Sequence, residues 1–268
     1  MDPELELRQA IERLYELFSR CGKPSYMQEA CGGDVSETDP VGILSKPLRE
    51  LTPVDLRTYV LSAISTFGTV SDYKYFLPRV YDIATSGPKH WADTPIILSK
   101  LAYGKWLSWP SAEQEAIRNF LRAWWRDTLS RYHPPVQVDD LLDGLAQCEE
   151  VDGYLCIMQE MCANELSARR HLAVLTYSFS FSPLRQDIWD CFPWWSEHPR
   201  QLRSLLSWLF DEATARFLDK QYIDPDLERE LGGASWPSAE MLLVAVDRYR
   251  RRRRACRDRV SQLPLPDV

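Results

Sequence analysis

The sequence predicts an all-α fold, arranged as an irregular antiparallel helical array or as a HEAT-like α-solenoid. Two observations predict it. Prolines next to Ser, Thr or Asp repeatedly precede segments whose apolar residues recur at helical intervals. The connections between these segments are short and polar or marked by proline, as between antiparallel helices. The sequence shows no fixed repeat near about 40 residues, which favours the irregular array.

The clearest helix begins at "LTPVDLRTYV". Thr52 can cap the helix, Pro53 suits its first position, and the Asp55 carboxylate opposes the helix dipole in the first turn. Helix starts of the same kind are predicted at Ser182 and Asp224. After Asp55, the helix that begins at Pro53 continues with apolar residues at helical spacing: Leu56, Tyr59, Val60, Ala63, Ile64 and Phe67.

The hexapeptide "SWPSAE" occurs at Ser108–Glu113 and again at Ser235–Glu240. Both copies place proline and glutamate where a helix begins. The sequences on either side of the two copies differ, which indicates two similar helix starts and not a duplicated module.

Further helices are predicted along most of the chain. One segment, "LTYSFSFS", alternates apolar and hydroxyl side chains as a strand would, but no second strand is found to pair with it, so we expect the end of a helix there. The chain is predicted to form a single domain, 1–268, with a sub-boundary near 133–138. The expected helices cover 3–21, 71–85 with a kink at Pro78, 94–105, 110–131, 138–147, 153–178 in one or two pieces, 183–191, 198–220 and 238–262.

Composition indicates a cytoplasmic globular protein. Apolar residues make up 45% of the 268 residues. The charged start "MDPELELRQA" does not resemble a signal peptide, and no run without Asp, Glu, Lys or Arg, including His171–Leu184, is long enough to cross a bilayer. Seven cysteines, without the paired spacing of a zinc site, are expected to be buried reduced thiols.

The sequence offers no motif for catalysis or for cofactor binding. It lacks a nucleophile elbow, a Walker loop, a dinucleotide-binding glycine pattern and a zinc-protease helix. We therefore expect no cofactor, no metal and no catalytic residue that sequence can identify, while an enzyme with a dispersed site stays a second alternative. The four histidines are expected to be surface or capping residues: His90, His133, His171 and His198.

The stretch "ILSKPLRELTPVDLRTYVLSAISTFGTVSDYKYFLPRVYDI" resembles an uncharacterised family of bacterial helical proteins. The resemblance covers about the first half of the chain and implies bacterial origin and an all-helical fold. This chain has Cys31 alone where the family has neighbouring cysteines, so no shared metal or redox role is carried over. The matching residues are Lys46, Pro47, Leu48, Leu51, Thr52, Asp55, Leu56, Tyr59, Gly68, Asp72, Phe76, Leu77, Pro78 and Arg79.

An arginine run lies near the carboxyl end. The window Arg248–Arg259 has a net charge of +7, which leaves −14 for the remainder of a chain whose total is −7. Such a helix can bind nucleic-acid phosphates, an anionic membrane or an acidic partner, or its arginines can pair with the protein's own carboxylates. The candidate anion-binding residues are Arg248, Arg250, Arg251, Arg252, Arg253, Arg254 and Arg257.

An acidic region has the opposite character. Tyr132–Ala168 contains no Lys or Arg. A surface of one sign attracts a basic partner, although it can also be a solvated face or a docking site for the arginine run. The candidate partner-binding residues are Asp139, Asp140, Asp143, Glu149, Glu150, Asp152 and Glu160.

The loop "WDCFPWWSEHP" concentrates aromatic side chains that can anchor a partner or fill gaps between helices: Trp189, Phe192, Trp194 and Trp195. Together these features predict a non-enzymatic protein–protein interaction protein of a bacterium. One version is an immunity or antitoxin-like inhibitor that covers a basic toxin with its acidic face. The alternative is a nucleic-acid-binding protein that uses the arginine run.

Overall fold

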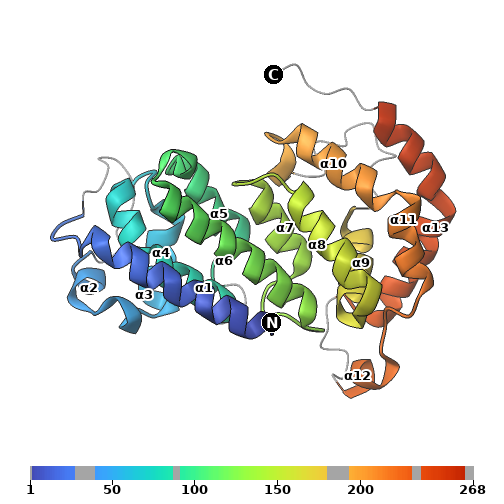
Figure 1. Cartoon of the computed structure of the whole chain (residues 1–268), viewed down its shortest axis with the longest axis horizontal. Helices are drawn as coiled ribbons and strands as arrows, with labels where there is room; N and C mark the ends of the chain where they lie inside the picture. Colours follow the sequence, from blue (N-terminus) through green and yellow to red (C-terminus); the bar gives the residue numbers. More distant parts are fainter. Residues whose placement is uncertain (1, 28–39, 87–90, 180–192, 231–236, 263–268) are drawn as a thin grey trace. The chain divides into compact units, whose positions relative to one another are not determined.

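The computed structural model describes residues 2–27, 40–86, 91–179, 193–230 and 237–262 (Figure 1). Within these ranges regular structure is helical, and the one β-type pairing is an isolated bridge between Ala63 and Phe67. The all-α prediction is confirmed. The chain divides into two compact units, Met1–Asp127 and Thr128–Val268. The single domain, its sub-boundary near 133–138, and the choice between an irregular array and a solenoid stay predictions.

The first unit is built around helices α1 and α4, which pack together. The Tyr15 hydroxyl on α1 donates a hydrogen bond of 2.9 Å to Asp82 on α4. The rings of Tyr81 and Phe120 stack at 4.8 Å and join α4 to α6. The elements are α1 (Pro3–Phe18), η1 (Ser19–Cys21), α2 (Pro40–Ser45), η2 (Leu48–Glu50), α3 (Pro53–Ser62), α4 (Val70–Ser86), α5 (Thr94–Tyr103), η3 (Trp106–Ser108) and α6 (Ser111–Ser130).

Helix α3 begins where the sequence predicts and ends earlier. The Thr52 side chain accepts from the Asp55 backbone N–H, and the Asp55 carboxylate accepts from the Thr52 backbone N–H, which forms a capping box. The helix ends at Ser62, and Ile64 has a left-handed φ of 66°. The predicted continuation through Phe67 is wrong, because a turn replaces the last helical turn while Ala63 and Phe67 still bury their side chains.

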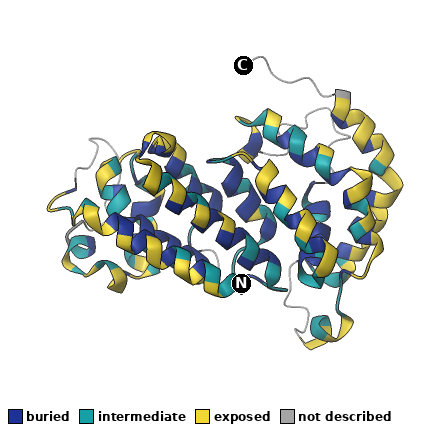
Figure 2. Cartoon of the chain, viewed as in Figure 1, coloured by how far each residue is buried: buried dark blue, intermediate teal, exposed yellow. Residues whose placement is uncertain are grey.

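The second unit is organised around α9, which packs against α7, α8 and α13. Its residues from Arg170 to Thr176 are all buried. Figure 2 shows buried positions along the α9 ribbon and on one side of its neighbours. The elements are α7 (Val138–Ala146), α8 (Asp152–Asn164), α9 (Leu166–Phe179), η5 (Pro193–Trp195), α10 (Pro199–Leu209), α11 (Glu212–Ala215), η6 (Arg216–Asp219), α12 (Pro225–Glu230) and α13 (Ala239–Gln262).

Most predicted helices of this unit are present. The helix expected over 153–178 forms as the two pieces α8 and α9, and Leu175–Phe179 of the alternating segment are helical. The single helix expected over 198–220 is wrong, because the Asp211 side chain caps a new short helix, α11, by accepting from the Ala213 N–H. The helix expected over 183–191 lies outside the described residues.

The first "SWPSAE" copy leads into α6, which begins at Ser111. The described part of the second copy leads into α13, which begins at Ala239, and the Ser238 hydroxyl accepts from the Met241 N–H at 3.3 Å. The motif therefore marks a helix start in both places.

Replacing Thr52 with alanine should destabilise the first unit by about 1 kcal/mol, because the capping side chain is lost. Thr52→Ser keeps the hydroxyl and should retain most of the stability. Urea unfolding followed by circular dichroism measures both variants. Equal losses in the two variants would show that the hydroxyl does not stabilise this helix start.

Candidate functional site

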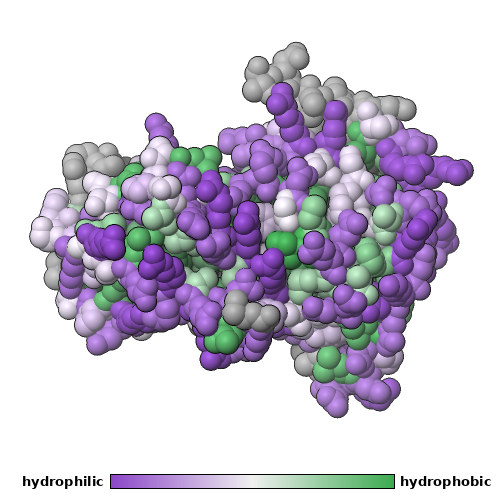
Figure 3. Space-filling view, in the orientation of Figure 1, coloured by the Kyte–Doolittle hydropathy of each residue, from purple (hydrophilic) through white to green (hydrophobic). Residues whose placement is uncertain are grey.

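The acidic candidates lie on α7, on α8 and on the turn between them. Four of them are exposed, and we name these four the acidic surface: Asp140, Glu150, Asp152 and Glu160. In the view of Figure 3, hydrophilic side chains cover much of the molecular surface, with smaller hydrophobic areas between them. Among the described residues, Glu150 and Glu160 make no ion pair or hydrogen bond, whereas Asp152 accepts from the Ser204 hydroxyl on α10.

The other three acidic candidates are partly buried and hold neighbouring elements. Asp139 accepts from the Ser178 hydroxyl at 2.6 Å, which joins α7 to the end of α9. Glu149 accepts from the Tyr154 hydroxyl at 2.5 Å. Asp143 accepts from the Trp195 indole N–H at 2.6 Å. We therefore assign these three carboxylates to the packing of the unit and not to a partner surface.

The aromatic loop is only partly described. Trp195 is 0% exposed and packs edge-on against Phe179, with 6.0 Å between ring centroids. It fills space between helices, so the expectation that it anchors a partner is corrected. Trp194 is 36% exposed and stays available for contact. Trp189 and Phe192 lie outside the described residues.

Burial raises the pKa of Asp143 to about 7. The Trp195 hydrogen bond opposes this rise, and the nearby Asp139 and Asp140 carboxylates add to it. Asp143 thus titrates close to neutral pH at a contact between α7 and η5.

The arginine run occupies α13, and four of its seven candidates form ion pairs. Arg250 and Arg253 lie 3.4 Å and 3.3 Å from Asp219 and Glu212. Arg251 pairs with Asp247, and Arg257 lies 4.0 Å from Asp258. None of these carboxylates belongs to Tyr132–Ala168, so these pairs do not dock the run on the acidic region.

The remaining arginines of the run are exposed. Within the described ranges, Arg252, Arg254 and Arg259 make no ion pair or hydrogen bond, and Arg248 lines a cleft. The run therefore combines paired and solvent-facing guanidinium groups on one helix.

A cleft of about 510 Å³ lies between the end of α9 and the first half of α13. Sequence reasoning did not identify it, because its residues form no motif and come from two segments far apart in the chain. Val244 in its lining is 53% exposed. The lining residues are Tyr177, Ser178, Glu240, Met241, Val244, Ala245 and Arg248.

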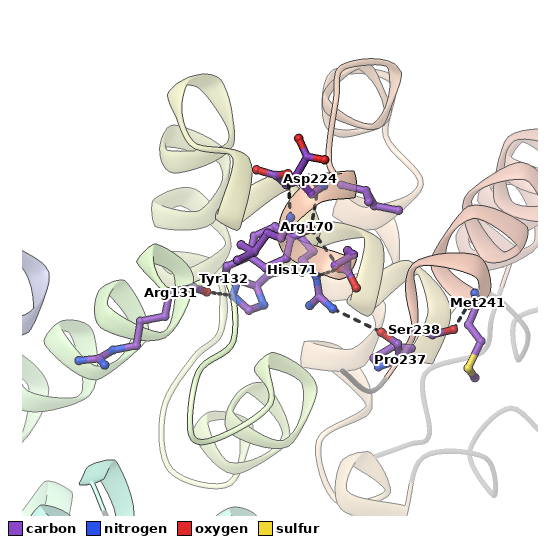
Figure 4. Close-up of polar contacts among 12 residues, drawn as sticks. Arg131, Tyr132, Arg170, His171, Asp224, Pro237, Ser238 and Met241 are labelled. Carbon is purple, nitrogen blue, oxygen red and sulfur yellow. Dashed lines mark hydrogen bonds and ion pairs between the residues drawn. The ribbon is translucent and has the colours of Figure 1, made fainter. Parts of the chain in front are cut away.

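Also in the second unit, a buried polar network centres on Arg170, which is 1% exposed (Figure 4). Its guanidinium lies 3.1 Å from Glu228 of α12 and donates to the Pro237 carbonyl at 3.3 Å. It also lies 4.8 Å above the Tyr132 ring. Glu228 accepts from the Tyr132 hydroxyl at 3.1 Å. The network fastens α12 and the segment before α13 to α9.

His171 follows Arg170 and is completely buried. Its Nε2 lies 2.7 Å from the Arg131 carbonyl, to which it donates, and its Nδ1 has no hydrogen-bond partner in the described part of the chain. Burial lowers the pKa of His171 to about 4, and the Arg131 carbonyl partly opposes this effect. The expectation of a surface or capping histidine is wrong at this position. The available signal was the position of Arg170 and His171 directly before the apolar stretch "LAVL".

The described residues include no group of three or more side chains able to hold a metal ion. Their five cysteines are free thiols; Cys148, Cys162 and Cys256 are buried, Cys21 is partly buried and Cys156 is exposed. Cys31 and His90 lie outside the described ranges, while His133 and His198 are partly buried.

Comparisons of the chain with protein-family models, curated proteins and solved structures find no match. In the parts of the chain that the structure describes, no helix has the length and apolar character needed to cross a membrane. Functional residues are thus indicated by the chain's own charges, cleft and exposed side chains.

Asp143→Asn should stabilise the protein at pH 8 by about 1–3 kcal/mol and have little effect at pH 4. The folded state binds a proton at Asp143 up to about pH 7, whereas an unfolded aspartate loses it near pH 4. Stability therefore falls as the pH rises through this window, and the penalty persists above it. Urea unfolding at both pH values tests this expectation. Asp140→Asn, on an exposed neighbour, should not reproduce the effect.

Protonation of His171 should reduce stability as the pH falls from about 6.5 to about 4, by roughly 3 kcal/mol at most. In this window the unfolded histidine takes up a proton and the buried one does not. His171→Gln should therefore flatten the pH dependence of the unfolding free energy by about one proton. An unchanged slope in the variant would contradict the assignment.

Proposed function

We propose that this chain is a non-enzymatic protein–protein interaction protein that binds a basic partner through its acidic surface. The observation that carries the proposal is the position of the four exposed carboxylates in a region without a positive side chain. Tyr132–Ala168 contains no Lys or Arg, and the exposed carboxylates come from both α7 and α8. Charges of one sign on neighbouring elements add their fields and steer an oppositely charged protein.

The carboxylates differ in what they can offer a partner. Glu150 and Glu160 lack ion pairs with the described residues, so a partner's Lys or Arg can pair with them without breaking an internal contact. Asp152 already accepts a hydrogen bond from the Ser204 hydroxyl, so it contributes to partner binding mainly through its negative charge. Trp194, at 36% exposure, follows Pro193 in η5, which packs against α7. It adds an apolar contact of the kind that dominates binding energy.

Nucleic-acid binding by the arginine run is the weaker alternative. Phosphate binding depends on the number of cations that release counterions. Four of the seven candidate arginines lie within 4.0 Å of the chain's own carboxylates, which lowers the positive potential of α13. Asp247 and Asp258 also place negative charge on exposed positions of the same helix.

A more specific version of the proposal is an immunity or antitoxin-like inhibitor that covers a basic toxin. Acidic inhibitors gain association rate from charge, and the acidic surface offers charge on rigid helices. The neighbouring gene would then encode a basic protein.

The charge reversal Glu150→Lys with Glu160→Lys should slow association with the basic partner by about tenfold or more at low salt. The partner is the stoichiometric basic protein recovered with the wild-type chain from its native host, and surface plasmon resonance measures the rate. Raising the salt concentration should reduce the difference between variant and wild type.

The matched control is Glu16→Lys with Glu230→Lys, which makes the same change in net charge at exposed positions elsewhere. It should leave most of the association rate unchanged. An equal effect of both pairs would reduce the proposal to net charge, and the absence of any basic partner would exclude it.

A further inference from the structure

We propose that the cleft between α9 and α13, together with the row Arg248, Arg252 and Arg259, binds an amphipathic helical peptide with an acidic end. We name these three residues the arginine row. The proposal does not rest on the function proposed above, because the acidic surface lies on α7 and α8. It adds a second interaction surface, with the opposite preference for charge.

The cleft changes character along its length. Glu240 lies in the first turn of α13, Met241 and Val244 follow, and Arg248 comes two turns after Glu240. On the α9 side, Tyr177 and Ser178 complete the lining. One end of the cleft is therefore acidic, its middle is apolar, and its other end is basic.

The arginine row continues the same side of α13. Residues four or seven apart on an α-helix lie on one side of it. Met241, Ala245 and Arg248 line the cleft. Arg252 lies four residues after Arg248, and Arg259 lies seven residues after Arg252. At 1.5 Å per residue the row is about 16 Å long. It therefore extends the basic end of the cleft by about three helical turns.

The opposite flank of α13 is already occupied. Arg250 and Arg253 pair with carboxylates of η6 and α11, and Arg250 also donates to the Leu218 carbonyl at 2.5 Å. Arg252 and Arg259 have no such partner among the described residues. The helix thus uses Arg250 and Arg253 to hold its own unit, while Arg252 and Arg259 are exposed on the other flank.

The order of acidic, apolar and basic side chains along the cleft fits a peptide better than a nucleic acid or an anionic membrane. A helix laid in the cleft would place a basic residue near Glu240, aliphatic residues on Met241 and Val244, and carboxylates along the arginine row. A nucleic acid would bring phosphate next to Glu240 and would leave the apolar middle unused. An anionic membrane would likewise bring its phosphates next to Glu240.

The cleft is built on a fixed base. Arg170 binds the Pro237 carbonyl, one turn before the first cleft residue of α13, and the Tyr249 hydroxyl donates to the Leu209 carbonyl at 2.7 Å. These two bonds hold α13 on either side of its cleft-lining part. A peptide can then dock without having to order the helix that receives it.

The test uses a synthetic amphipathic peptide of about 18 residues, the length that spans the cleft and the row. One face carries Lys, Leu, Leu, Glu and Glu in that order, and a second peptide carries the reversed order. Fluorescence anisotropy measures binding to the full chain. We expect one of the two orders to bind, and Arg252→Glu and Val244→Asp each to weaken binding by tenfold or more.

Each variant has a matched control on the outer side of α13. Arg254→Glu changes an exposed arginine without a described ion pair, and Leu243→Asp changes an apolar residue that is also 53% exposed. Neither lines the cleft or lies in the row, so both should retain binding within about twofold. Circular dichroism establishes that all four variants keep their helix content.

Three outcomes would overturn the proposal. The first is that Arg252→Glu and Arg254→Glu weaken binding equally, which would indicate unspecific attraction to α13. The second is that neither peptide order binds. The third is that a DNA oligonucleotide or a phosphatidylserine vesicle binds more tightly than the peptides and depends on the same arginines.

Discussion

The second unit depends on one buried positive charge. Arg170 is removed from water in the buried stretch Arg170–Thr176 of α9, and an isolated charge in such a place is strongly unfavourable. Its ion pair with Glu228, its bond to the Pro237 carbonyl and the Tyr132 ring compensate for the lost hydration. These partners come from three separate segments, so satisfying the charge brings those segments together around α9.

The position of α13 explains how one basic helix can have two uses. Its apolar residues face α9 and α10, and its arginines therefore fall on both flanks of the buried stripe as well as on the outer side. Carboxylates of α11 and η6 lie beside one flank, where they neutralise Arg250 and Arg253. The other flank adjoins the cleft. Composition alone would assign all arginines of the run a single role.

Local signals predicted most helices, and long-range packing decided the rest. Thr52 and Asp55 predict a helix start from sequence alone, because the two residues of a capping box are only three positions apart. The end of α3 and the break at Asp211 depend on how the following residues pack, which periodicity does not reveal. The charges of the sequence were enough to locate the acidic surface. They did not reveal that Asp143 points inward or that Trp195 is buried. The cleft forms where two segments, near residues 178 and 244, lie side by side. No sequence pattern indicated that these segments are close in space.

The division between the units falls inside α6, between Asp127 and Thr128, although the helix continues to Ser130. Leu129, in its last turn, is 0% exposed. A protease or a gene truncation that separated the chain at this division would remove a buried leucine from the helix that carries it. Expression of the first unit alone would therefore succeed best with the whole of α6 retained. The second unit would need to begin before Arg131 and Tyr132, because these residues bind His171 and Glu228.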